Sequence, residues 1–260
     1  FRIYGATGSP YLRDGVGEYY SGSWYTYGSP SAPYRGQYVT PAVDGYSGCQ
    51  GDHFYVEPVK PLGGFIPSPL HPRQIVVDWA MSFYPELGLF RVDDPLNLSY
   101  EVQSEVYTFD EATLEKASPC NGTQYLQVPG SLEALMAPVA ERVTRDVESP
   151  YLKVKALESY LKANYSYNTS YTRSPTGVDP VEWFLFYEGQ GVCTNFNSAL
   201  TLLARSLGSP ARLVTGYLVD PVAEIQSVDS SQAHVYTEVL FDGLGWIVFD
   251  ATPVDGGWAP

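Results

Sequence analysis

The sequence has 260 residues, of which 44% are hydrophobic and 22 are Tyr, and its formal net charge is −14. This composition supplies enough apolar surface for a real core and argues against intrinsic disorder. With only 15 Lys and Arg, the chain lacks the clustered positive charge that nucleic acids and anionic membrane surfaces require of a partner.

The first half of the chain has the pattern of a β-rich domain. Residues 1–60 bring Tyr, Gly, Ser and Pro in quick succession without helical periodicity, which predicts short strands joined by ordered loops. Strand signals are stronger in residues 74–78 and in residues 96–109. In the second of these segments apolar and polar residues alternate, which predicts an antiparallel sheet with one buried face. We therefore predict a strand-rich N-terminal domain over residues 1–129.

Near Pro129 the pattern changes from strand-like to helical, and we place a second domain over residues 130–260. Ser149 followed by Pro150 is typical of an N-cap and a first helical position. The turn at Asp242-Gly243 predicts a hairpin. The expected elements are helices over 131–147 and 150–165, a strand over 211–219, a polar loop over 220–232 that is a candidate lid, and hairpin strands over 233–240 and 245–250.

Cys193 follows a glycine-bearing turn and stands where an amphipathic helix begins. Apolar residues recur after it at helical spacing, and Gly208 and Pro210 end the pattern. The first turn of a helix offers unpaired N–H groups and the positive end of the helix dipole, and both favour a thiolate. The alternative for a lone cysteine is an inert residue packed as a small hydrophobe.

His234 and Asp250 stand near the open end of the predicted hairpin. His234 lies 8 residues before the turn and Asp250 lies 7 residues after it, so the two side chains are expected to be close across the ladder. A carboxylate there would hold the imidazole while its other ring nitrogen faces Cys193. Such a unit cleaves or transfers amides through a thioester. Taken singly, His234 is better explained as an ordinary strand-end histidine and Asp250 as an ordinary turn residue. Taken together with their order and flanking residues, they favour the catalytic interpretation.

The sequence starts at Phe1 without Met and without a signal peptide, so it is either a processed chain or an excised fragment, and we expect a fragment. A second feature indicates an exported protein. Four of the six Asn head the N-x-S/T pattern of a glycosylation acceptor, namely Asn97, Asn121, Asn164 and Asn168.

An exported protein with three Cys leaves one unpaired. Our hypothesis is a disulfide between Cys49 and Cys120 with Cys193 free.

Several blocks around these residues occur in an order that resembles the transglutaminase-like superfamily of papain-like thiol enzymes. The blocks are Gly191-Val192-Cys193, Leu207-Gly208-Ser209-Pro210-Ala211-Arg212, Val214-Thr215-Gly216-Tyr217, His234 with Glu238-Val239, and Trp246-Ile247-Val248-Phe249-Asp250-Ala251-Thr252-Pro253. The resemblance covers about residues 131–253. It implies an α+β fold in which a helix carrying the cysteine packs on an antiparallel sheet carrying the histidine and the aspartate.

The upstream block Asp179-Pro180-Val181-Glu182-Trp183-Phe184-Leu185-Phe186 is similar to a membrane-anchored bacterial and archaeal branch of the superfamily. In that branch a strand-rich segment and the transglutaminase-like domain form an ectodomain between transmembrane helices. The resemblance implies that this chain is such an ectodomain, on the extracellular side of the cytoplasmic membrane.

Position by position, the resemblance makes Cys193 the nucleophile, His234 the general base and later acid, and Asp250 the orienting carboxylate. A metal site using His234 with Cys193 would need a second Cys or His at ligand spacing, and the sequence has none there, so we expect no metal and no cofactor. The Cys193 N–H is a natural oxyanion donor, and Gln190 or Trp183 are candidates for a second. Arg212 matches a structural position and is expected to pair with a buried carboxylate. The chain departs from the family pattern at Tyr236, where Trp is usual, and at Ser209, where Ile is common.

The sequence therefore favours a thiol-dependent acyl transferase or amidase that acts on glutamine side chains or peptide amides. The acyl-enzyme would be resolved by an amine, which forms a cross-link, or by water, which hydrolyses it, and the partner is a protein or peptide substrate. The alternative is a non-catalytic transglutaminase-like module that binds peptide or cell-wall components.

Overall fold

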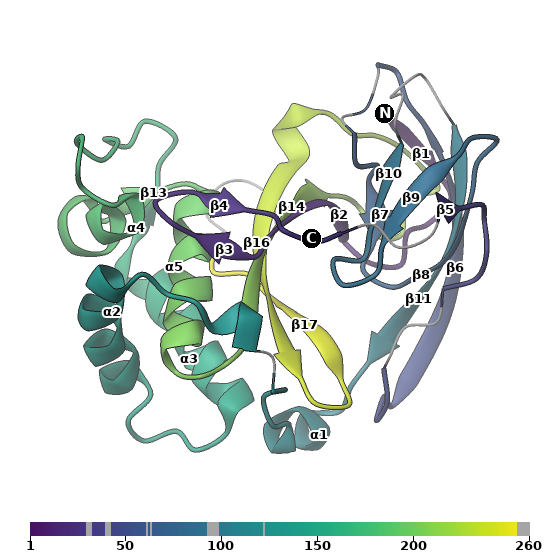
Figure 1. Ribbon diagram of the computed structural model, residues 1–260. Coiled ribbons are helices and arrows are strands. Elements are labelled where there is room, and N and C mark those ends of the chain that lie inside the picture. The colour runs from purple at the N-terminus through teal and green to yellow at the C-terminus, as the bar shows by residue number, and fades with distance from the viewer. Residues whose placement is uncertain are drawn as a thin grey trace.

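The computed structural model describes residues 1–29, 33–39, 43–60, 62, 64–92, 99–121 and 123–253. Three layers lie side by side in Figure 1: helices on the left, a five-stranded sheet in the centre and a second five-stranded sheet on the right. The predicted α+β class is confirmed. Within the described residues, no helix combines the length and apolar character needed to cross a bilayer.

The central sheet is antiparallel, with the strand order β17-β16-β14-β2-β7. Its strands are β2 (Tyr11–Gly17), β7 (Ser68–Pro69), β14 (Ala211–Leu218), β16 (Ala233–Phe241) and β17 (Gly245–Phe249). The predicted hairpin and the strand before it are confirmed. At Gly216 a Cβ would lie 1.8 Å from the Leu12 carbonyl oxygen, so only glycine lets β14 approach β2 so closely.

Helices cover one face of this sheet. They are α2 (Gly130–Val143), α3 (Pro150–Asn164), α4 (Pro180–Trp183) and α5 (Cys193–Ser206). The Ser149 hydroxyl accepts the Leu152 N–H at 3.4 Å, so the predicted N-cap is confirmed. Every residue of α5 from Phe196 to Arg205 is buried, which makes it the central helix of the helical half. A helix buried along this length holds its first residue firmly.

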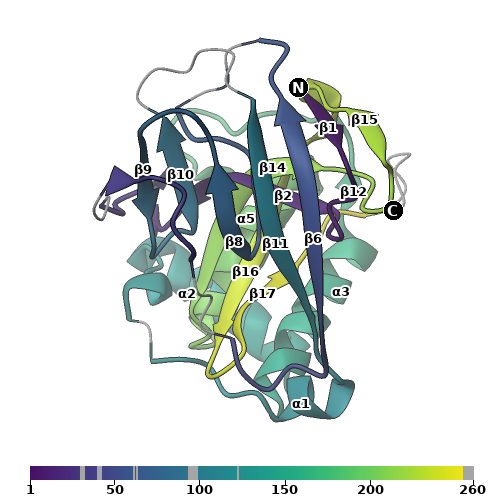
Figure 2. The same ribbon diagram turned by 90° about the vertical axis from the view of Figure 1, so that its right-hand side faces the viewer.

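The outer sheet has the order β15-β1-β6-β11-β8 and lies in front of the central sheet in Figure 2. Its strands are β1 (Arg2–Tyr4), β6 (Gly48–Glu57), β8 (Pro72–Val76), β11 (Tyr100–Thr108) and β15 (Ile225–Ser227). In β11 the side chains of Tyr100, Val102 and Ser104 are buried while Glu101 is exposed, so the predicted alternation is confirmed there. Residues 96–98 of that predicted strand lie outside the described residues.

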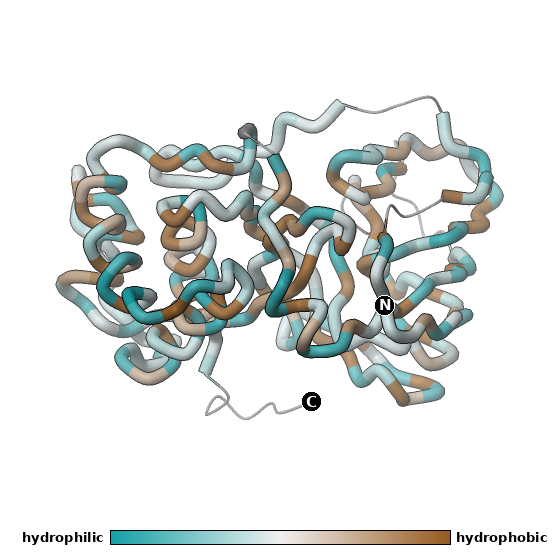
Figure 3. The backbone as a smooth tube through the Cα atoms, turned by 90° about the horizontal axis from the view of Figure 1, so that it is seen from below, coloured by the Kyte–Doolittle hydropathy of each residue, from teal (hydrophilic) through white to brown (hydrophobic). Residues whose placement is uncertain are grey.

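Shorter elements connect these layers. They are β3 (Tyr19–Tyr20), β4 (Trp24–Tyr25), β5 (Pro33–Tyr34), β9 (Met81–Tyr84), β10 (Leu89–Val92), β12 (Ser166–Tyr167), β13 (Gln190–Gly191), α1 (Glu111–Lys116), η1 (Thr123–Leu126), η2 (Phe184–Glu188) and η3 (Ser230–Gln232). Figure 3 shows apolar stretches in the helical half and in the strand-rich half alike. One buried apolar cluster surrounds α5, and another lies within the strand-rich half.

The two halves of the sequence exchange strands across the predicted boundary at residue 129. The N-terminal strand β2 joins the central sheet, and the C-terminal strand β15 joins the outer sheet. The loop over 220–232, predicted as a candidate lid, is hydrogen-bonded to the chain's first residues: Val228 N–H donates to the Phe1 carbonyl at 2.8 Å. The boundary marks a change in sequence pattern, and strands from both sides of it build each large sheet.

The hypothesis of a Cys49–Cys120 disulfide is wrong for this structure, in which all three cysteines are free thiols. Cys49 is exposed on β6, paired opposite Tyr107. The Cys120 N–H donates to the Leu240 carbonyl at 3.2 Å, which holds Cys120 beside β16. Cys49 is thus part of the outer sheet, while Cys120 is held against β16 of the central sheet. An odd number of cysteines gives no information on pairing geometry.

Candidate active site

The turn before α5 presents Cys193 at the start of the helix. Gly189 has φ +70°, a left-handed conformation that favours glycine. At Gly191 an added Cβ would lie 2.7 Å from the Asn195 side chain, so glycine is required there as well. The Asn195 side-chain oxygen accepts the Val192 N–H at 3.0 Å and caps the helix. These contacts explain the Gly-x-Cys block: glycine makes room for the cap that fixes the cysteine.

His234 and Asp250 meet at the open end of the hairpin, as predicted. The distance from His234 Nε2 to Asp250 Oδ2 is 2.6 Å, and the side chains are 9% and 17% exposed. Burial lowers the pKa of His234, but the hydrogen bonds and negative charges of Asp250 and Cys193 outweigh it and raise the pKa to about 9. Burial raises the pKa of Asp250, but its hydrogen bond and attraction to His234 lower it to about 2. The pair is therefore an imidazolium and a carboxylate at neutral pH.

Cys193 lies close enough to the same imidazole to raise its pKa. Because Nε2 is bound to Asp250, Nδ1 is the ring nitrogen that remains for the thiol. The structure thus brings together all three residues that the sequence selected, from the start of α5, the start of β16 and the end of β17. An imidazolium next to a sulfur atom stabilises the thiolate and can later donate its proton to a leaving amine.

Three residues that sequence reasoning missed hold Asp250. Asp250 Oδ1 accepts hydrogen bonds from Asn197 Nδ2 at 3.0 Å and from the Thr252 N–H at 2.9 Å. Tyr11, on β2, donates to Asp250 Oδ2 at 3.4 Å. Burial, together with the Asp250 charge, raises the pKa of Tyr11 far above its usual value, so the phenol stays a donor. The N-terminal half of the chain therefore contributes directly to the site.

The two residues predicted as candidates for a second oxyanion donor are Trp183 and Gln190, and the structure places them differently. The Trp183 indole N–H donates to the Thr172 carbonyl at 2.9 Å, and its ring stacks on Tyr187, so this donor is already occupied and the prediction is corrected. Gln190 accepts from Asn168 at 2.6 Å through its oxygen, and the role of its amide nitrogen stays a prediction. The backbone N–H of Cys193 has no acceptor within the described part of the chain and remains available to an oxyanion.

A buried ion cluster lies behind the site. Glu238 Oε2 pairs with Arg212 Nε at 2.7 Å, which confirms the expected partner for Arg212, and Glu238 Oε1 pairs with Arg13 Nη2 at 2.7 Å. All three side chains are at most 3% exposed. Arg212 also lies 3.9 Å above the Trp246 ring. The cluster ties β2, β14, β16 and β17 together, and its Glu238 lies four residues along β16 from His234.

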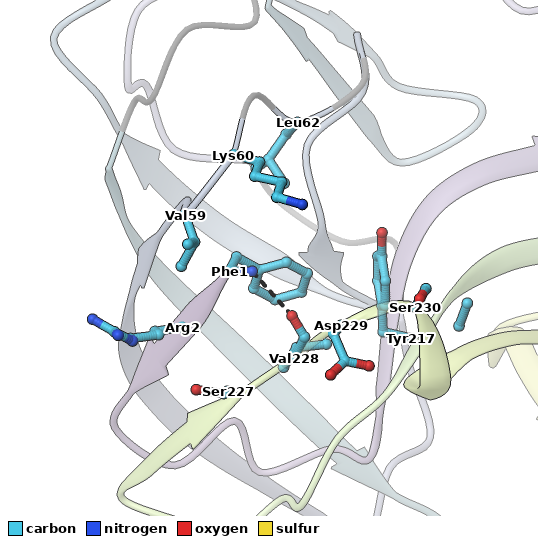
Figure 4. A pocket seen from close by; sticks show the side chains of 11 residues that line it. Phe1, Arg2, Val59, Lys60, Leu62, Tyr217, Ser227, Val228, Asp229 and Ser230 are labelled. Carbon is cyan, nitrogen blue, oxygen red and sulfur yellow. Dashed lines mark hydrogen bonds between the residues drawn. The ribbon is translucent and has the colours of Figure 1, made fainter.

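A cavity of about 560 Å³ lies near the start of β16 (Figure 4). Its lining includes Phe1 and Tyr217, whose ring centroids are 5.0 Å apart, and Lys60. Ala233, the neighbour of His234 in sequence, also lines it, but Cys193, His234 and Asp250 do not. The triad is therefore not part of this cavity.

Comparison with known families gives a match for part of the chain. Residues 137–251 match the family model of the transglutaminase-like superfamily. The resemblance drawn from the sequence blocks is confirmed by this match.

Two curated proteins are similar in sequence to this chain. The chain is 34% identical over 173 residues to the uncharacterised protein YebA of Bacillus subtilis (strain 168), covering 63% of this chain and 22% of YebA. It is 29% identical over 121 residues to a protein-glutamine gamma-glutamyltransferase of Pseudomonas aeruginosa (strain PAO1), covering 44% of this chain and 18% of that protein. The chain therefore spans about a fifth of the length of these curated relatives.

A solved structure has the same fold along nearly the whole chain. The periplasmic domain of TgpA from Pseudomonas aeruginosa superposes with a TM-score of 0.70 at 20% identity, covering 96% of this chain and 86% of that domain. The likeness extends through the strand-rich half as well as the helical half. The arrangement of both sheets is therefore an established fold.

The pKa of His234 leads to a test of the Asp250 contact. In Asp250→Asn the lowering effect of burial remains while the charge that raises the pKa is removed, so we expect the pKa of His234 to fall below about 9. Activity that needs the imidazolium should decline near pH 9 in the native protein and at a lower pH in the variant. The pH dependence of kcat for both proteins measures this. An unchanged alkaline limb would mean that Asp250 does not set the basicity of His234.

Proposed function

We propose that this domain is a cysteine-dependent acyl transferase or amidase acting on glutamine side chains or peptide amides. The Cys193 sulfur bonds to the amide carbon, and the imidazolium of His234 gives its proton to the leaving nitrogen as the C–N bond breaks. A thioester and free ammonia or amine result. An amine or water then attacks the thioester while His234 takes up its proton, and the C–S bond breaks to restore the thiolate beside the imidazolium.

The observation that carries this proposal is the placement of His234 between Asp250 and Cys193. A mostly buried carboxylate at 2.6 Å fixes the ring by one nitrogen and leaves the other for the sulfur. Support also comes from the Pseudomonas aeruginosa relative, a protein-glutamine gamma-glutamyltransferase. We propose in addition that the domain acts outside the cytoplasm as the ectodomain of a membrane-anchored protein. The periplasmic origin of the TgpA domain supports this location.

Mass spectrometry of a glutamine-containing peptide separates the possible outcomes. Incubation with the protein and a dansylated alkylamine should yield amine incorporation if the thioester is resolved by amines. Deamidation, seen as a mass gain of about one dalton, or backbone cleavage would identify water as the acceptor. The same assay with Cys193→Ala is the matched control, and each product should disappear.

Alkylation by iodoacetamide separates the enzyme from a binding module. Cys49 is an exposed internal reference, because slight desolvation and the nearby Glu105 raise its thiol pKa and keep it protonated at neutral pH. We expect Cys193 to be alkylated faster than Cys49 by peptide mapping at neutral pH. If Cys193 reacts no faster and no peptide product forms, the non-catalytic peptide-binding module is the better description.

A further inference from the structure

Asn197 is a fully buried polar residue on the apolar side of α5, and nothing in the proposed chemistry uses it directly. It lies one helical turn after Cys193, between the buried residues Phe196 and Leu200. Burying an amide costs free energy unless its hydrogen-bonding groups are satisfied. The hydrogen-bond partners of the Asn197 side chain therefore indicate the role of this buried residue.

The Asn197 side chain reaches every segment that carries a triad residue. Its Nδ2 group lies 3.0 Å from Asp250 Oδ1, 2.8 Å from the carbonyl of Val235, which follows His234, and 3.2 Å from the Cys193 carbonyl. Its Oδ1 accepts the Ala251 N–H at 3.0 Å. One amide thus links the nucleophile helix, the histidine strand and the segment after β17.

The bonds to Asp250 and Ala251 fix the carboxylate from two directions. The Nδ2 group holds Oδ1, while the Ala251 bond holds the backbone that carries the carboxylate. Oδ2 is then directed at His234 Nε2. A carboxylate free to rotate would hold the imidazole less well, and loss of alignment at a reacting group costs much of the rate.

We propose that Asn197 is a positioning residue that orients Asp250, and through it His234, for the reaction at Cys193. The predicted effect of Asn197 on turnover rests on the proposed function. Its effect on the histidine ring can be measured without any substrate. It accounts for a hydrogen-bonding amide at a helix position where an apolar side chain would otherwise pack.

Ring-nitrogen NMR of histidine tests the proposal directly, because the chain has only three His. His71 serves as an internal marker, since burial and the charge of Arg13 lower its pKa to about 4. His234 faces Asp250, Cys193 and the phenol of Tyr11. In Asn197→Ala we expect the pKa of His234 to fall by about one pH unit as the Asp250 contact loosens. We also expect kcat to fall by about 100-fold.

The matched control is Thr201→Val, which removes a buried hydroxyl one turn further along α5. Thr201 Oγ1 bonds to the Asn197 carbonyl and to Thr237 but does not contact Asp250. This variant should leave the His234 titration unchanged. If Asn197→Ala also leaves the titration and the ring tautomer of His234 unchanged, Asn197 is only a packing residue and the proposal is wrong.

A second variant serves if Asn197→Ala does not fold. Asn197→Asp keeps the shape and the acceptor oxygen but can donate to Asp250 only while its carboxyl is protonated. The two carboxyl groups cannot both ionise freely at such a distance. We therefore expect native-like His234 behaviour at low pH and loss of the Asp250 contact as the pH rises. A residue that only packs would give the native pH profile of kcat throughout. Catalytic inactivity of the native protein would refute the proposed function without affecting the NMR result.

Discussion

Cys193→Ala should abolish turnover and leave the fold unchanged. Without the sulfur no thioester forms, and loss of the nucleophile in a triad enzyme reduces kcat by about 10⁶-fold. The Cys193 side chain is only partly buried, and it interacts with His234. The change therefore removes no packing that α5 depends on. An assay of glutamine-peptide turnover measures the loss of activity. A circular dichroism melt of the variant shows whether the fold is unchanged.

The other two cysteines provide the control for that experiment. Cys49 and Cys120 are free thiols away from the triad, so Cys49→Ser with Cys120→Ser should retain native turnover. Cys193→Ala also removes a group that raises the pKa of His234, so that pKa should fall in the variant. Retention of full turnover in Cys193→Ala would show that another group is the nucleophile.

The triad could be predicted from the sequence because each part follows from local geometry. A cysteine after a glycine turn and before an apolar helix is placed at the N-terminus of that helix by periodicity alone. The hairpin turn fixes which residues of β16 and the end of β17 can meet, and His234 and Asp250 are indeed 2.6 Å apart. Both inferences use spacings of fewer than 20 residues, where chain connectivity limits the possible arrangements.

The N-terminal residues that support the triad were missed because their contacts are not local. Tyr11 reaches Asp250 across 239 residues of sequence, and Arg13 reaches Glu238 across 225. The segment that became β2 contains Gly15 and Gly17 and has no distinctive periodicity. Nothing in it showed that it would enter the central sheet. Pairing between strands so far apart depends on the whole fold, which local propensity does not contain.

Asn197 is different, because the sequence did hold a signal for it. An amide between Phe196 and Leu200, one turn from the cysteine, interrupts the apolar stripe of α5 at a buried position. A buried polar residue requires partners, and residues one turn apart lie on the same face of a helix. The pattern therefore indicates a polar contact close to Cys193. Which segment supplies the partner depends on the tertiary structure.

Glu238→Gln should lower the free energy of unfolding by about 3–5 kcal/mol, because removing one member of a buried charge cluster leaves the others uncompensated. Burial raises the pKa of Glu238, but Arg13 and Arg212 outweigh it and lower the pKa, so the side chain is an anion between two cations. The glutamine has nearly the same shape, so the loss would come from charge rather than from packing. Urea denaturation followed by circular dichroism measures it.

The matched control for Glu238→Gln is Glu57→Gln on the outer sheet. Glu57 pairs with Arg2 at 3.7 Å, and the two side chains are 42% and 53% exposed, so this change should cost at most about 1 kcal/mol. Because Tyr11 and Arg13 share β2, loss of the Glu238 contact should also loosen the hydrogen bond from Tyr11 to Asp250. Turnover should then fall in Glu238→Gln under conditions where the variant is still folded. Equal stability of the two variants would show that the buried cluster is not what fixes β2 against β14 and β16.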